Sequence, residues 1–202
     1  MQQENPSSLD QILNQVWAML LPAAKDPNNP LHLSTLANVG HYGCHMRTVL
    51  LHEVWLTERT LICYSQLRSS KIEEIRADPR VRWLFYHPQQ HIQLQLAGNA
   101  TIHTDDALAD QQWATIPPSE RIFYLYVKKL ATPSSEPISG LPDFLLDRLP
   151  TMEESEAGRN NFAVISCKIN FIDWLQVREK GGNLRAQFIW QGEDLKATWV
   201  VG

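Results

Sequence analysis

Segments typical of β-strands gather toward the two ends of this chain, and a mainly helical stretch separates them. Alternating or β-branched apolar runs predict strands at residues 32–39, 46–55, 60–65, 81–87, 92–103, 162–169, 173–179, 184–190 and 195–201. A parallel α/β sheet needs strands that alternate with helices, and this chain lacks that order. The sequence therefore predicts a mainly β fold with appended helices (α+β), built on an antiparallel barrel. Gly98, inside a long alternating segment, is expected to mark a bulge or bend.

Helical patterns complete the predicted architecture at residues 8–24, 69–77, 104–116, 119–130 and 142–149. The first has a single apolar stripe, and Ser8 precedes it as a helix cap. A helical and loop excursion is expected over about residues 104–161, and its part after residue 130 is rich in Pro, Ser, Glu and Gly. A length of 202 residues suits a single domain spanning residues 1–202.

The overall charge argues against several classes of protein. Eighteen Lys and Arg residues against 22 Asp and Glu residues give a net charge of -4, so nucleic-acid binding is not expected. No apolar run approaches the ~18 residues of a membrane span, and the polar start lacks the order of a signal peptide. We therefore expect a cytoplasmic protein. Its three cysteines read as free thiols, and no cysteine or histidine spacing predicts a metal site.

A cluster of cations and hydroxyls is the strongest candidate for a binding site. Arg47 opens one predicted strand, and Tyr64 and Ser65 close another. Arg68, Ser69, Ser70 and Lys71 follow at the start of a predicted helix. Fixed donors at the positive end of a helix favour a phosphate. The alternative is that Ser69 only caps the helix and Lys71 is solvated.

These residues also stand in a recognisable order. R-x-V-L-L at residues 47–51 is followed, about a dozen residues later, by C-Y-S-x-L-x-S-S-K at 63–71 and I-x-x-I-R-A-D-P-R-V at 72–81. Gln93 then precedes Gly98 by five residues. This order resembles the flavin-binding half of pyridoxamine 5'-phosphate oxidase. The resemblance implies an antiparallel split barrel that forms homodimers, with FMN in two clefts at the subunit interface.

The resemblance also implies cofactor contacts in the first half of the chain. Arg47 and Lys71 would bind the FMN phosphate or the pyrimidine edge, and Val49 and Leu50 would present backbone groups to the ring system. Tyr64 and Ser65 match a Tyr-Thr pair of the family, and Gln93 matches a glutamine that hydrogen-bonds the flavin. Ser70 stands where the family has an arginine, and Arg68 is the candidate to replace that charge.

Further contacts are implied toward the C-terminus. Trp174 matches an aromatic residue near the flavin, and Ser134 or Ser135 matches a polar pair given by the second subunit. Arg185 or Gln187 would fill the family's last arginine position.

The family's substrate-binding residues are mostly absent. His52 replaces a substrate-binding lysine, and Gln112, Ile116 and Glu120 replace a Tyr, Arg and Ser set that binds the substrate's phosphate. A carboxylate repels a dianion, so we predict no specific pyridoxamine 5'-phosphate oxidase activity. The expectation is an FMN-dependent oxidoreductase whose small-molecule substrate and catalytic residues are unknown. Two alternatives stay open: a non-catalytic flavin- or haem-binding module for storage, sensing or stress response, and a structural β-barrel interaction protein.

Overall fold

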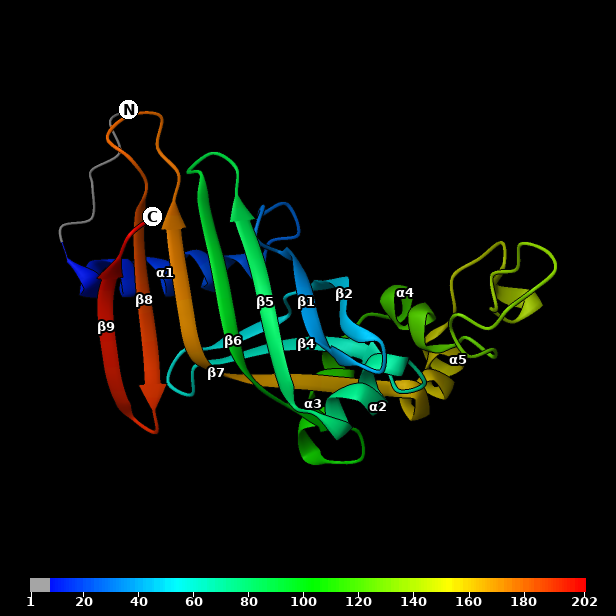
Figure 1. Ribbon diagram of the computed structural model, residues 1–202. Coiled ribbons are helices and arrows are strands. Elements are labelled where there is room, and N and C mark those ends of the chain that lie inside the picture. The colour runs from blue at the N-terminus through cyan, green and yellow to red at the C-terminus, as the bar shows by residue number, and fades with distance from the viewer. Residues whose placement is uncertain (1–7) are drawn as a thin grey trace.

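The computed structural model describes residues 8–202, in which nine strands form one antiparallel sheet (Figure 1). The strands are β1 (Leu33–Gly40), β2 (Gly43–Leu50), β3 (Glu53–Trp55), β4 (Thr60–Gln66), β5 (Arg80–His87), β6 (Ile92–His103), β7 (Phe162–Gln176), β8 (Leu184–Gln191) and β9 (Asp194–Val200). Their order is β2-β1-β5-β6-β7-β4-β3, and β8 and β9 continue from the second half of β7. The predicted mainly antiparallel β fold with a few helices is confirmed.

The long strand β7 makes the sheet bend. On one edge, the first half of β7 pairs with β4 and the second half pairs with β8. On the other edge, β6 pairs with β7 along the whole length of β6. The register of β6 against β7 shifts between Ala97 and Gly98, which confirms the bulge predicted there. A Cβ on Gly98 would lie 2.0 Å from the Lys168 carbonyl oxygen, so only glycine allows this approach. The predicted break between strands 162–169 and 173–179 is wrong, because β7 passes through it.

A second error concerns the predicted strand 46–55, which is two strands. β2 ends at Leu50 and β3 begins at Glu53. Between them the Leu51 N–H donates to the His32 carbonyl, and the His52 N–H donates to the Ile62 carbonyl, both at 2.9 Å. The chain therefore passes from the edge of β1 to the edge of β4 at this point.

Five α-helices accompany the sheet in the described residues: α1 (Leu9–Ala23), α2 (Ser70–Ala77), α3 (Ala107–Thr115), α4 (Pro118–Arg121) and α5 (Met152–Glu156). Three 3-10 turns are η1 (Ile122–Tyr124), η2 (Asp143–Leu145) and η3 (Ala157–Asn161). The Ser8 side chain accepts a hydrogen bond from the Gln11 N–H, as its predicted role as a cap requires. The apolar stripe of α1 is buried in the core beside β3, β8 and β9.

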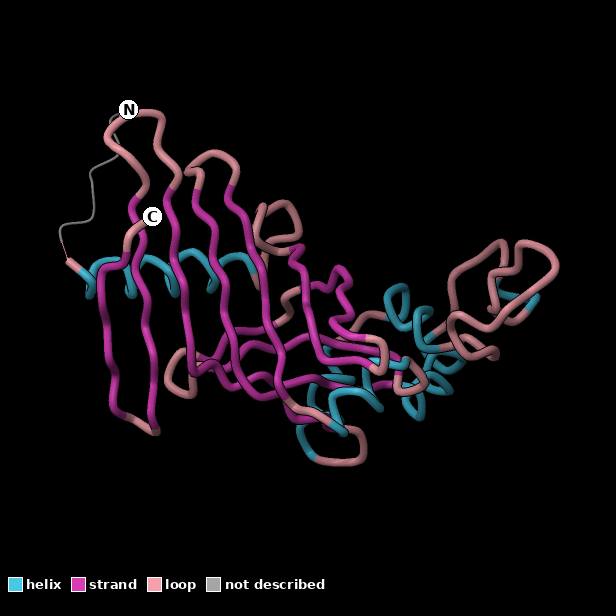
Figure 2. Tube along the Cα trace, in the orientation of Figure 1, coloured by secondary structure: helices cyan, strands magenta, loops and turns pink. Residues whose placement is uncertain are grey.

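Two predicted helices are much shorter than expected. The helix at 119–130 stops after α4 and η1, because its Ile122–Tyr124 segment tightens into a 3-10 turn and aromatic and β-branched residues continue it poorly. The helix at 142–149 is only the turn η2. Figure 2 shows that loops dominate this excursion, which extends from one end of the sheet. No helix in the described part of the chain is long and apolar enough to cross a membrane.

One face of the sheet leaves large apolar side chains exposed over β1, β2 and β5. They are Leu33, Val39, Met46, Leu50, Leu84 and Tyr86. Cross-strand partners such as Leu33 and Leu50 point to the same side of the sheet. We call this set the apolar sheet face. An exposed apolar area of this kind typically marks a contact surface.

Candidate functional site

A pocket of about 310 Å³ lies where β2, β4, α2 and η1 meet. Its lining residues are Leu33, Thr48, Val49, Leu50, His52, Tyr64, Ser65, Gln66, Lys71, Phe123 and Tyr124. We call it the β2–β4 pocket. Five of the predicted site residues therefore come together around one hollow, namely Val49, Leu50, Tyr64, Ser65 and Lys71.

Lys71 gives one end of the β2–β4 pocket a positive charge. Its Nζ donates to the Ser65 Oγ at 3.0 Å and to the Ser69 Oγ at 2.8 Å. Ser69 is the N-cap residue of α2 by position, yet its side chain makes no capping bond and instead accepts from Lys71. Burial, and then the nearby Arg47, lower the pKa of Lys71. An ammonium group, two hydroxyls and a helix N-terminus together favour an anion.

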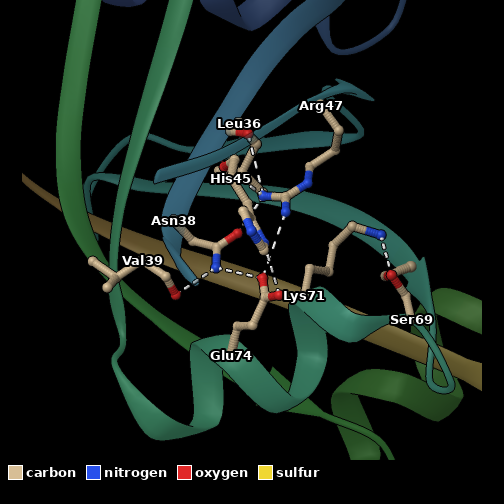
Figure 3. A network of polar contacts seen from close by, with 9 residues as sticks. Leu36, Asn38, Val39, His45, Arg47, Ser69, Lys71 and Glu74 are labelled. Carbon is tan, nitrogen blue, oxygen red and sulfur yellow. Dashed lines mark hydrogen bonds and ion pairs between the residues drawn. The ribbon is translucent and has the colours of Figure 1, made fainter. Parts of the chain in front are cut away.

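Arg47 lies beside this end and is held by other residues (Figure 3). Its Nη1 donates to the Asn38 Oδ1, to the Leu36 carbonyl at 3.4 Å and to the His45 carbonyl at 3.2 Å. Its Nη2 lies 3.6 Å from the Glu74 Oε2. The guanidinium group thus faces Glu74 and Asn38, and Arg47 is not among the lining residues of the pocket.

Glu74 organises this network from α2, one turn after Lys71. It accepts hydrogen bonds from the Asn38 Nδ2 and lies 2.9 Å from the His45 Nδ1. Burial raises the pKa of Glu74, but these hydrogen bonds and the Arg47 charge outweigh it, so the net pKa is lowered. The sequence analysis did not identify Glu74, Asn38 or His45. The i, i+3 spacing of Lys71 and Glu74, which places both on one helix face, was the available signal.

A second part of the pocket wall, which we call the aromatic end, is formed by His52 and Tyr64. The His52 and Tyr64 rings stack with centroids 3.7 Å apart and planes 16° from parallel. Burial, with a smaller effect of His32, lowers the pKa of His52 to about 4. Burial also raises the pKa of Tyr64 to about 12, with the carboxylates of Glu53 and Glu120 adding to the effect. Both rings are therefore neutral at physiological pH.

Three other predicted residues lie outside the β2–β4 pocket. Arg68 lines a neighbouring pocket of about 410 Å³, where its Nη1 lies 3.4 Å from the Val127 carbonyl. Ser70 is exposed in the first turn of α2. Ser134 is exposed in the loop before η2. Within one chain, these side chains do not join Lys71.

Gln93, Trp174 and Arg185 lie on the strands β6, β7 and β8. Gln93 pairs with Leu175, and Leu175 pairs with Arg185, so Gln93 and Arg185 share one face. Tyr86 pairs with Gln93, so this is also the apolar sheet face. Arg185 forms an ion pair with Asp173, with Nε 2.9 Å from Oδ1.

Trp174 differs from the prediction, because its side chain points to the opposite side and is fully buried in the core. The alternation of β7 explains this, since neighbouring residues of a strand face opposite sides. The structure therefore does not present Trp174 to a ligand from this face.

The three residues that stand in place of the family's substrate-phosphate ligands do not form an anion site. Gln112 and Ile116 are buried on and after α3, and Glu120 is exposed on α4. The nearby Arg121 is buried, and its guanidinium binds Glu156 and the carbonyls of Ile116 and Trp113. Within residues 8–202 no group of three metal-ligating side chains is present either.

The first half of the chain is similar to a known protein family. The model of the pyridoxamine 5'-phosphate oxidase FMN-binding domain matches residues 8–104, which include the wall of the pocket formed by β2, β4 and α2. Over these residues, just under half of the chain, the sequence is similar to that domain. The matched segment contains Arg47, Val49, Leu50, Ser65 and Lys71.

Solved structures extend the likeness to the whole fold. A pyridoxamine 5'-phosphate oxidase-related FMN-binding protein from Nostoc punctiforme PCC 73102 has a TM-score of 0.70 at 17% identity, over 93% of this chain and 96% of that one. PhzG from Burkholderia lata 383, in complex with tetrahydrophenazine-1-carboxylic acid, has a TM-score of 0.65 at 15% identity, over 98% and 95%. At such identities the likeness establishes the fold alone. No curated protein matches the sequence.

Proposed function

We propose that this chain is an FMN-binding flavoprotein that acts as a flavin-dependent oxidoreductase. The observation that carries the proposal is Lys71, whose Nζ lies within 3.0 Å of two serine hydroxyls at the N-terminus of α2. This group forms one end of a pocket whose wall lies largely in the segment that matches the FMN-binding domain.

The residues present fit the cofactor. Lys71, Ser65 and Ser69 would hold the phosphate, and Val49 and Leu50 on β2 would lie along the ring system. Bound FMN supplies two-electron redox chemistry. The chain orients it, and His52 and Tyr64 close the aromatic end of the pocket. Arg47 stands beside the phosphate end and adds positive potential from its network with Glu74.

We further propose that two copies pair through the apolar sheet face in a homodimeric split barrel. Gln93 and Arg185 lie on the same face as Leu33 and Leu50, which line the β2–β4 pocket. A partner docked there would bring its own Gln93 and Arg185 toward this pocket. This arrangement also gives a reason for six exposed apolar side chains on one sheet face.

The FMN proposal is tested with single variants at the phosphate end. In Lys71→Ala the main cation of the pocket is lost, and in Arg47→Ala the neighbouring charge is lost. A charge-assisted contact to phosphate is worth roughly 1.5–3 kcal/mol, so we expect about 10- to 100-fold weaker FMN binding for Lys71→Ala and a smaller loss for Arg47→Ala. Quenching of flavin fluorescence measures the FMN affinity of both variants.

Lys180→Ala is the matched control, because Lys180 is exposed in the turn between β7 and β8. Its FMN affinity should equal that of the unmodified chain. Equal affinity in all three variants would show that FMN, if bound, does not use this pocket.

A further inference from the structure

We propose that the aromatic end of the β2–β4 pocket selects a planar aromatic substrate that carries no phosphate and is uncharged or cationic, with His52 as the residue that selects it. The inference rests on the proposed function, because it assumes that FMN fills the phosphate end. It goes further by assigning a substrate class. Four observations on residues around Tyr64 support it.

The first observation is a hydrogen-bonded chain that ends on a carboxylate. The Tyr64 hydroxyl donates to the Gln112 Oε1 at 2.5 Å, and the Gln112 Nε2 donates to the Glu53 Oε1 at 3.1 Å. The Trp55 Nε1 donates to the other oxygen of Glu53 at 2.6 Å. Gln112 is buried, its Oε1 and one of its two Nε2 hydrogens are engaged in this chain, and its neutral amide supplies no positive charge for a phosphate.

The second observation is the sign of the charges nearby. Glu53 and Glu120 both act on Tyr64 as negative charges. Among the residues lining the pocket, Lys71 is the one Lys or Arg side chain, and it lies at the phosphate end. Neither carboxylate lines the pocket, but both act electrostatically on Tyr64, so an anionic group beside Tyr64 would be repelled and a cationic group attracted.

The third observation is that Arg121, the nearest other cation, is not available to bind a substrate phosphate. Arg121 follows Glu120 directly, but its side chain is buried and stacks over the Trp113 ring at 4.5 Å from the centroid. It is bound to Glu156 and to two backbone carbonyls, and so fastens α4 to α3 and α5. Turning it toward a substrate would break the hydrogen bonds of a buried guanidinium to two backbone carbonyls and its ion pair with the half-exposed Glu156, and the carbonyls would lose their donor.

The fourth observation is the state of His52. Its ring lies flat on Tyr64 and lines the pocket, and no group in residues 8–202 forms a hydrogen bond to its imidazole. A neutral imidazole has one donor and one acceptor nitrogen. It can therefore bind an uncharged heteroatom or an amine of a flat ring, and it supplies no positive charge for a phosphate.

Pyridoxamine and pyridoxamine 5'-phosphate form a suitable probe pair, because they differ only in the phosphate. Each is titrated into the FMN-loaded chain, and the change in the flavin absorption spectrum reports binding. We expect pyridoxamine to bind at least tenfold more tightly than its phosphate ester. In His52→Lys the added cation should reduce or reverse this preference, and in His52→Gln, which stays neutral, the preference should remain.

His41→Lys is the matched control, because it adds the same charge at an exposed position in the turn between β1 and β2. A preference for the phosphate ester in the FMN-loaded chain, or no binding of pyridoxamine, would overturn the inference alone. An unchanged preference in His52→Lys would remove His52 as the selecting residue. A chain that takes up no FMN, as its spectrum would show, would overturn the proposed function together with the inference.

Discussion

At the scale of single residues, two side chains define the ends of the β2–β4 pocket. Lys71 carries the charge at one end, and His52 lies neutral on Tyr64 at the other. Burial lowers the pKa of both side chains. The pocket therefore combines one ammonium group with an uncharged aromatic pair.

The lowered pKa of His52 makes stability depend on pH. Its pKa is about 4 in the folded chain, against 6.5 for an ordinary histidine. Between these values the unfolded chain takes up a proton that the folded chain does not, so stability is lost as the pH falls from about 6.5 to 4. At roughly 1.4 kcal/mol per pKa unit, the loss is at most about 3.5 kcal/mol.

Urea unfolding of the unmodified chain and of His52→Gln, at pH 7 and pH 4.5, measures this effect. The glutamine variant cannot take up the proton, so it should lose less stability over this interval. An equal loss in both proteins would mean that His52 is not protected from protonation in the folded state.

The sequence predicts much of this site at the residue level, and the reason is local. Val49 and Leu50 end β2, Tyr64 and Ser65 end β4, and Lys71 begins α2, so short connections bring them together. The orientation of Arg47 is different, because it depends on Glu74 and Asn38, which come from α2 and β1. No simple sequence pattern shows which of several distant residues an arginine side chain will contact.

At the scale of elements, the bulge in β6 decides how the sheet bends. Gly98 lets the backbone of β7 approach closely, and β7 then carries β4 on one half and β8 on the other. The glycine was identifiable from sequence as an interruption of a regular alternation. The continuity of β7 was not, because Asn170 and the residues around it read as a break between two strands.

Gly98→Ala should destabilise the fold strongly. The added Cβ would meet the Lys168 carbonyl at 2.0 Å, and this backbone atom belongs to a paired strand. We expect a loss of more than about 3 kcal/mol in free energy of unfolding, or no soluble protein. Ala97→Ser, at the adjacent residue, should change stability by less than about 1 kcal/mol. Comparable denaturation midpoints for the two variants would contradict this account of the bulge.

At the scale of the whole molecule, one chain leaves the predicted site divided. The β2–β4 pocket shares a sheet face with Gln93 and Arg185, which lie on other strands, and Ser134 lies in the loop before η2. Sequence reasoning gave the sheet class correctly because alternation is a local signal. It missed the short elements of the excursion, since their ends depend on packing by residues such as Arg121.

The proposed dimer predicts a coupling between association and cofactor binding. Met46→Glu places a charge on the apolar sheet face, where Met46 is 70% exposed. We expect light scattering to show two copies for the unmodified chain and one for the variant, with FMN affinity reduced at least tenfold. Leu56→Glu, on an exposed apolar residue in the turn between β3 and β4, should leave the number of copies and the FMN affinity unchanged. A Met46→Glu chain that stays dimeric would exclude this face.

The central claim is that the β2–β4 pocket binds FMN through its phosphate. Calorimetric titration of the unmodified chain with FMN, and in parallel with riboflavin, which lacks the phosphate, tests it directly. The account predicts saturation at one FMN per chain and at least tenfold weaker binding of riboflavin. No heat of binding with FMN, or equal affinity for the two flavins, would contradict it.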